Sequence, residues 1–187
     1  MRYSMIETLK DLVRRLDALQ VSYMITGSFA MHAYATGRLT YDIDAVIEIS
    51  NRDAAAFESM FLPDYYVDQL SIRRAIEHNS MFNVIDQRNG VKVDCIIKKP
   101  TETEIEKFAR RQQSQIDDTR FWVISKEDLI LSKLAWAKQS LSEKQFMDIR
   151  SLLAGDTDRS FLQRHVVLLG LQEIWAEYEK WKIRTEK

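Results

Sequence analysis

The chain has 187 residues, a formal net charge of −1 and a single cysteine. A hydrophobic content of 45% supports one well-buried domain, the near-zero net charge gives no overall attraction to nucleic acid, and one cysteine excludes an internal disulfide. No apolar run has transmembrane length and no signal peptide is recognisable, so we expect a cytoplasmic protein with no membrane partner. Cys95 lies in an apolar run and is expected to belong to the core.

The first half of the sequence alternates between helix-like and strand-like segments. Apolar residues recur at helical spacing near the start, and a Gly-Ser pair at positions 27 and 28 separates a strand-like run from a short helical one. Asn89-Gly90, the strongest short signal for a β-hairpin, stands between two further strand-like runs. The predicted segments are helix 3–19, strand 21–25, a short helix from Ser28, strand 41–49, helices 53–60 and 69–78, and strands 81–85 and 91–97.

Beyond Pro100 the pattern becomes predominantly helical. Ser125, with an acidic residue three positions later, resembles the start of a helix. We expect an α/β (α+β) fold in which residues 1–124 form a sheet-bearing core with an N-terminal helix. Residues 125–187 are expected to form a C-terminal helical region, with a cleft between the two parts that suits a nucleotide. The predicted segments here are helix 102–113, strand 121–124 and helices 126–139, 143–153, 159–169 and 171–183.

Three aspartates interrupt otherwise apolar, strand-like runs. Asp42 and Asp44 lie two residues apart in one run, and Asp94 lies in another. Because side chains alternate along a strand, Asp42 and Asp44 point to the same face, where two carboxylates repel each other unless a cation lies between them. Hard divalent cations such as Mg²⁺ bind through carboxylates together with substrate phosphates, so the pattern predicts a metal site. The alternative is that the pair lies on the solvated face of an edge strand.

The junction at Gly27 and Ser28 connects a strand to a helix. Glycine lets the backbone approach a ligand closely, and the N–H groups at a helix N-terminus attract anions such as phosphate. Any strand-to-helix turn can use this pair, so the signal becomes specific only in combination with the Asp-x-Asp pattern that follows it.

In combination, these features resemble the signature of the nucleotidyltransferase superfamily related to DNA polymerase β. The Gly-Ser pair, a spacer of residues 29 to 41 and the Asp-Ile-Asp that follows match the first part of the signature, and Asp94 matches its third carboxylate. Within the superfamily, the sequence is most similar to the AbiEii-type abortive-infection toxins and their small stand-alone relatives. This resemblance extends over most of residues 20–153 and rests on residues 26–30, 38–44, 82–94 and 127–134.

The resemblance implies a metal-dependent nucleotidyltransferase that moves a nucleotide from an NTP to an acceptor hydroxyl on tRNA or on a protein. By this resemblance, Asp42, Asp44 and Asp94 are catalytic and bind Mg²⁺ or Mn²⁺, with Asp94 nearest to the acceptor hydroxyl. A toxin that pairs with a cognate antitoxin is the implied biological role, and a catalytically lapsed module that binds a nucleotide or a partner is the alternative. The residues implied in binding the NTP phosphates are Gly27, Ser28, Arg38 and Lys133.

Several of the remaining candidates have ordinary structural explanations. Arg38 can be a surface arginine, and the Lys133 side chain can extend from an apolar helix to solvent. Lys144 and Asp148, four residues apart, can form a simple ion pair along a helix. The histidines at 32 and 78 match no metal-ligand spacing and the four tryptophans are scattered, so structural roles are expected for both sets.

Overall fold

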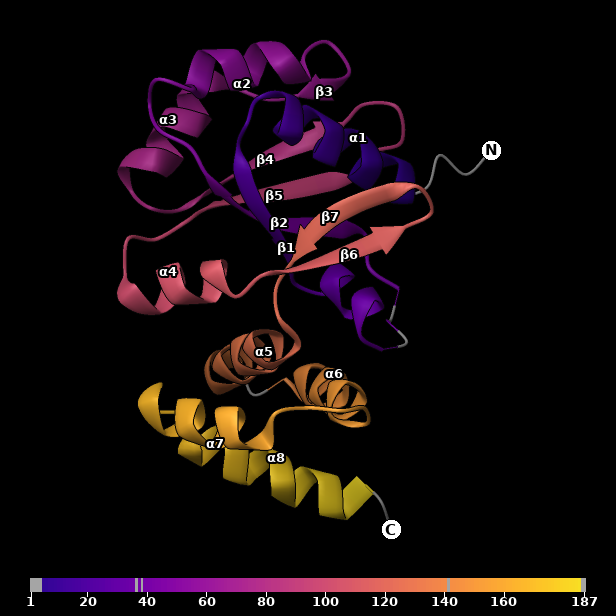
Figure 1. The fold of residues 1–187 in the computed structure, drawn as a ribbon, viewed down its shortest axis with the longest axis vertical. Coiled ribbons are helices and arrows are strands. Elements are labelled where there is room, and N and C mark those ends of the chain that lie inside the picture. The colour runs from indigo at the N-terminus through magenta and orange to yellow at the C-terminus, as the bar shows by residue number, and fades with distance from the viewer. Residues whose placement is uncertain (1–4, 36, 38, 141, 186–187) are drawn as a thin grey trace. The chain divides into compact units, whose positions relative to one another are not determined.

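A computed structural model describes residues 5–35, 37, 39–140 and 142–185 (Figure 1). The described residues form two compact units, one within 1–30 and 38–124 and the other within 31–37 and 125–187. All strands of the described sheet belong to the first unit, and the second is built from helices. The short segment 31–37 groups with the helical unit, although it lies between two strands of the sheet in the sequence.

The first unit is built on a mixed β-sheet flanked by helices. Its strands are β1 (Ser22–Thr26), β2 (Asp42–Glu48), β3 (Tyr65–Tyr66), β4 (Met81–Asp86), β5 (Lys92–Ile97), β6 (Gln112–Ile116) and β7 (Thr119–Val123). Its helices are α1 (Met5–Ala18), α2 (Ala54–Phe61), α3 (Gln69–Glu77) and α4 (Glu102–Ala109), with the 3₁₀ helix η1 beginning at its edge (Phe29–Ala33). The seven strands follow the order β3-β4-β5-β2-β1-β7-β6, with β2 parallel to β5, β1 parallel to β7 and all other neighbouring pairs antiparallel. This architecture, followed by a helical region, confirms the predicted fold class.

Helices α1, α2 and α3 cover one face of the sheet (Figure 1). Strand residues on this face are almost completely buried, and Ile43, Val93 and Phe82 are each at most 3% exposed. The ring of Phe57 packs against those of Phe61 and Phe82, with centroids 4.5 and 5.4 Å apart. Because burial of this apolar face fixes the orientation of each strand, the intervening side chains must point to the opposite face of the sheet.

Two strands of the sheet, β3 and β6, are missing from the sequence predictions. β3 has only two residues, and β6 is a polar edge strand of sequence Gln-Gln-Ser-Gln-Ile whose residues are all at least partly exposed. The helix predicted over 102–113 ends at Ala109, because the residues that follow pair with β7. The segment after Ser28 is helical, as predicted, but forms a 3₁₀ helix of five residues.

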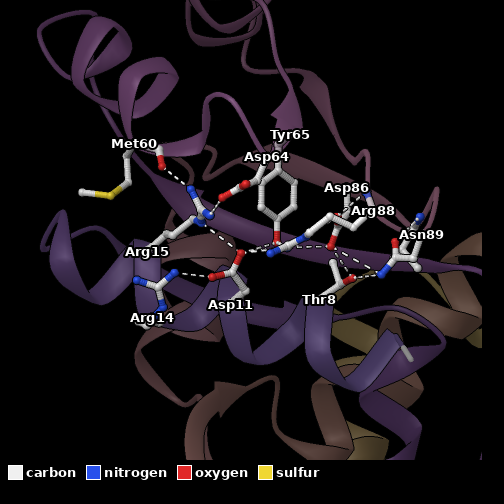
Figure 2. Close-up of polar contacts among 11 residues, drawn as sticks. Thr8, Asp11, Arg14, Arg15, Met60, Asp64, Tyr65, Asp86, Arg88 and Asn89 are labelled. Atoms are coloured by element: carbon white, nitrogen blue, oxygen red, sulfur yellow. Dashed lines mark hydrogen bonds and ion pairs between the residues drawn. The ribbon is translucent and has the colours of Figure 1, made fainter. Parts of the chain in front are cut away.

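A polar network connects α1 to the β4–β5 hairpin (Figure 2). Its centre is Asp86, which is fully buried and accepts hydrogen bonds from Thr8 Oγ1 at 2.8 Å and from Arg88 Nε at 2.7 Å. Arg88 Nη2 also donates to Asp11 Oδ2 at 2.9 Å. Charge-assisted hydrogen bonds thereby compensate the buried charge within the fold. Asp86 is accordingly a structural carboxylate.

Asp11 gives this network a dependence on pH. Burial raises the pKa of Asp11, but hydrogen bonds from Arg14, Arg88 and Tyr65 outweigh burial and lower the pKa to about 2. A carboxylate with a depressed pKa stabilises the fold above its unfolded pKa of about 4, and this contribution is lost as the pH falls toward 2. We expect Asp11→Asn to lower the free energy of unfolding by about 1–2 kcal/mol near neutral pH and by much less near pH 2.5. Urea unfolding at both pH values checks this, and an equal loss at the two would contradict it.

The second unit contains the four helices that the sequence predicts beyond residue 125. They are α5 (Lys126–Ser140), α6 (Glu143–Leu153), α7 (Arg159–Leu168) and α8 (Gln172–Thr185). Phe146 packs against Tyr178 and Trp181, with ring centroids 5.7 and 5.6 Å apart. Trp136 is 64% exposed, so the packing role expected for the tryptophans does not hold for this one. Among the described residues, no helix is both long and apolar enough to cross a membrane.

Candidate active site

The register between β2 and β5 aligns the three aspartates singled out in the sequence. The two strands are parallel, with Asp44 opposite Asp94 and Asp42 opposite Lys92. Because partners in register project to the same face, all three carboxylates lie on the face that α1, α2 and α3 leave uncovered. Strand β2 lies between β5 and β1, which excludes the alternative of an edge strand. Asp94 is 7% exposed, and Asp42 and Asp44 are half-buried.

Both oxygens of the Asp94 carboxylate accept hydrogen bonds from neighbouring side chains. Asn83, its partner on β4, donates from Nδ2 to Oδ1, and Lys92 donates from Nζ to Oδ2 at 2.9 Å. The hydrogen bond to Asp94 raises the pKa of Lys92 above its ordinary value, against the lowering effect of desolvation. The charges of Asp42 and Asp44 raise it further, so the Lys92 ammonium is within electrostatic reach of all three carboxylates.

Asp42 is positioned by the residue two places before it. The Thr40 hydroxyl is buried and donates from Oγ1 to Asp42 Oδ1 at 2.6 Å. This hydrogen bond restricts the orientation of the Asp42 carboxylate at the start of β2. The second carboxylate oxygen of Asp42 can accept from or bind another partner.

Gly27 provides the surface against which the Asp44 carboxylate packs. Thr26 is opposite Asp44 in the antiparallel pairing of β1 and β2, so Gly27 follows directly beside that carboxylate. The φ angle of Gly27 is +65°, and a Cβ atom at this position would stand 1.9 Å from Asp44 Oδ2. Only glycine therefore combines the left-handed backbone with the close approach of Asp44.

We expect Gly27→Ala to displace the Asp44 carboxylate, because a contact under 2 Å cannot be accommodated without movement, and to weaken binding of Mn²⁺ at the predicted metal site by about tenfold or more. Gly90→Ala is the matched control: its φ angle is +76°, and a Cβ there would meet no atom within 4 Å. Both variants should lose stability from backbone strain, by about 1–2 kcal/mol. Isothermal titration calorimetry with Mn²⁺ checks the difference, and equal Mn²⁺ affinity in the two variants would contradict it.

The other residues proposed to bind phosphates are only partly placed. Ser28 follows Gly27 and is half-buried at the start of η1. Arg38 lies outside the described residues. Its role and that of Ser28 toward phosphate stay predictions.

Lys133 lies in the second unit, on α5. Its ammonium donates to Asp148 Oδ2 on α6 at 2.7 Å, and the two side chains are only 5% and 4% exposed. Lys133 therefore does not extend to solvent. Asp148 on α6 pairs with a residue of another helix, whereas the sequence spacing suggested a pair with Lys144 along its own helix. A contribution of Lys133 to binding of NTP phosphates stays a prediction.

The residues on the carboxylate-bearing face of the sheet fit a divalent metal ion in their chemistry. Three carboxylates on neighbouring strands offer the hard oxygen ligands that Mg²⁺ and Mn²⁺ prefer. Gly27 leaves room for the Asp44 carboxylate, and any Cβ at position 27 would fill that room. Within the part of the chain that the structure describes, no three His, Cys, Asp or Glu side chains are already gathered at a distance suited to a metal. Simultaneous contact of one metal ion with all three carboxylates would therefore require side-chain movement, whereas two carboxylates together with substrate phosphates also form a binding arrangement for Mg²⁺.

Sequence reasoning missed Lys92, Asn83 and Thr40. Lys92 carried a usable signal, because it precedes Asp94 by two residues within one predicted strand and therefore shares its face. Thr40 carried none, because it lies before the strand that contains Asp42. Asn83 had none, since its place opposite Asp94 depends on the register of the hairpin.

Solved structures similar to this chain are nucleotidyltransferases or resemble them, so the fold is the nucleotidyltransferase fold. An antigenic nucleotidyltransferase-like protein from Paracoccidioides brasiliensis aligns with a TM-score of 0.57 at 17% identity, over 94% of this chain and 92% of its own. The antibiotic-resistance factor ANT(2'')-Ia aligns with a TM-score of 0.56 at 13% identity, over 100% and 95%. The lincosamide antibiotic adenylyltransferase LnuA aligns with a TM-score of 0.52 at 14% identity, over 78% and 94%. No family model and no curated protein sequence matches the chain.

Proposed function

We propose that this protein is a metal-dependent nucleotidyltransferase that moves a nucleotide from an NTP to an acceptor hydroxyl. The observation that carries the proposal is the register of β2 and β5, which places Asp44 opposite Asp94 and Asp42 one step along the same face. Carboxylates so placed in the centre of a sheet are costly without a cation. The nucleotidyltransferase fold supports the proposal that this cation is a divalent metal ion that takes part in nucleotide transfer.

The three carboxylates share the metal in the proposed reaction, and Asp94 has a second role. Asp42, Asp44 and Asp94 would hold Mg²⁺ or Mn²⁺, which would neutralise the charge that develops on the phosphate oxygens. Asp94, nearest to the acceptor hydroxyl, also orients that hydroxyl and accepts its proton. The acceptor oxygen then forms a bond to the α-phosphorus of the NTP while the bond to the leaving pyrophosphate breaks.

Backbone and side chains outside the trio complete the proposed NTP site. The N–H groups at Gly27 and Ser28, with the Ser28 hydroxyl, bind the terminal phosphates. Arg38 and Lys133 contribute positive charge toward the same phosphates.

The proposed acceptors are tRNA and protein, as the resemblance to AbiEii-type toxins implies, in a cytoplasmic protein controlled by a cognate antitoxin. Two similar structures also favour testing small hydroxyl compounds, since one is described as an adenylyltransferase of a lincosamide antibiotic and another as bound to adenylyl-2''-tobramycin. The second candidate function is a lapsed module of the same fold that binds a nucleotide or a partner without transfer.

Transfer of label from each of four α-³²P-labelled NTPs tests the proposal. The protein is incubated with Mg²⁺ or Mn²⁺ and, in separate arms, with total tRNA, lysate protein, an aminoglycoside or a lincosamide. Label that appears in one acceptor and disappears in EDTA supports the enzyme. NTP binding by calorimetry without transfer in any arm supports a lapsed module that binds a nucleotide. Absence of both binding and transfer rejects the enzyme and the nucleotide-binding module, and leaves the module that binds a partner.

A further inference from the structure

The Lys92 side chain contacts the carboxylate trio of Asp42, Asp44 and Asp94 through its ion pair with Asp94. It lies on β5 opposite Asp42 and two residues before Asp94, so all three side chains share one face of the sheet. Its Nζ atom donates to Asp94 Oδ2 at 2.9 Å. A divalent ion bound by Asp94 would have to contact the carboxylate at the place that this ammonium occupies.

The two partners of this ion pair differ in their exposure to solvent. The Asp94 side chain is 10% exposed and is also held by Asn83 through its other oxygen, whereas the Lys92 side chain is 42% exposed. A long, half-exposed lysine can leave the pair by rotating about its own bonds, while the aspartate remains oriented by Asn83. The ion pair can therefore open without disturbing the carboxylate.

Electrostatics gives the ammonium a function while no metal is bound. Three carboxylates on one face repel each other, and the Lys92 ammonium on the same face, opposite Asp42 and in contact with Asp94, offsets part of that repulsion. A divalent ion that reaches Asp94 must replace the Lys92 ammonium, because two cations cannot share one oxygen without strong repulsion. On the basis of the proposed function, we infer that Lys92 is a tethered counter-ion of the carboxylate trio, which a divalent metal ion displaces from Asp94.

This exchange has a consequence for the order of binding. The free metal ion binds weakly because it must first displace Lys92. An NTP that brings the metal also brings phosphates, whose negative charge compensates the displaced ammonium. Lys92 thereby favours binding of the metal together with the nucleotide over binding of the metal alone.

Calorimetric titration with Mn²⁺ alone tests the inference without relying on activity. Lys92→Met removes the competing charge and is expected to bind Mn²⁺ at least about fivefold more tightly than the natural chain, the effect of releasing one ion pair. Lys92→Arg keeps the charge and is expected to retain the weaker affinity. Lys98→Met is the matched control, because Lys98 follows β5 directly and pairs with Glu48, four residues beyond Asp44 on β2. It should leave the Mn²⁺ affinity unchanged.

Thermal unfolding provides a second test, because a lysine with only a structural role would give a different dependence of Tm on Mn²⁺. In EDTA, Lys92→Met is expected to have a lower Tm than the natural chain, and Mn²⁺ should restore it. If Lys92→Met does not fold in EDTA, recovery of the folded protein at Mn²⁺ concentrations below the dissociation constant of the natural chain supports the inference. Failure to recover at any Mn²⁺ concentration overturns it.

The outcomes separate this inference from the proposed function. If the natural chain binds Mn²⁺ through Asp44, and Lys92→Met binds it equally or more weakly, the counter-ion role is wrong while the metal site stands. If neither protein binds Mn²⁺, the metal site is wrong and the role of Lys92 is rejected with it.

Discussion

Asp44→Asn is expected to lower the rate of the proposed nucleotide transfer by about 10³-fold, near the upper range for loss of one electrostatic contact to a transition state. Asparagine has almost the same shape as aspartate and fits the same space beside Gly27, but it lacks the charge that holds a divalent ion. The free energy of unfolding should therefore change little, and loss of mutual repulsion within the trio can even increase it. Label transfer under saturating NTP and Mg²⁺ is the measurement.

The control for Asp44→Asn is the same chemical change elsewhere on β2. Glu48 lies on the same face, four residues further along, and pairs with Lys98 at the exposed end of the strand. Glu48→Gln should leave transfer unchanged, because this carboxylate is remote from the trio and only forms a surface ion pair. Equal activity of Asp44→Asn and Glu48→Gln would remove Asp44 from the mechanism.

The pairing of Asp42 with Asp44 is predictable because it depends only on alternation within one strand. The delivery of Asp94 by a hairpin is also predictable, since Asn89-Gly90 marks the turn between β4 and β5. The register of β2 against β5 is not predictable in this way, because the two strands are parallel and are separated by helices and another pair of strands. A shift of two residues would keep the same faces and place Asp94 opposite a different residue.

The missing strands reflect the limits of hydrophobic patterns at the edge of a sheet. β6 pairs with β7 on one side only and exposes much of both faces, so its glutamines show no period of two. Arg and Gln are good helix formers, and this propensity extends the predicted helix past Ala109. Pairing with β7 overrides it, because the backbone hydrogen bonds of Gln112–Ile116 are made in the hairpin.

Sequence spacing also could not predict the ion pair of Lys133 and Asp148, because the two residues lie on different helices of the second unit. The four-residue spacing of Lys144 and Asp148 favours a surface pair along one helix, whereas burial of Asp148 depends on how α5 packs against α6. This difference changes the expected cost of losing Asp148. Surface ion pairs contribute little, while a buried pair becomes very unfavourable when one partner is removed.

Asp148→Ala is accordingly expected to destabilise the protein by about 3–5 kcal/mol, since it leaves the Lys133 ammonium buried and removes its 2.7 Å hydrogen bond. Urea unfolding measures the loss. The double variant Lys133→Met with Asp148→Leu removes both charges, and it should recover most of the stability because a buried pair can be replaced by apolar residues of similar size at little cost. A double variant as unstable as Asp148→Ala would show that packing around Asp148, and not loss of its ion pair with Lys133, accounts for the effect. If Asp148→Ala loses less than about 1 kcal/mol, Lys133 reaches solvent or another acceptor once its partner is gone.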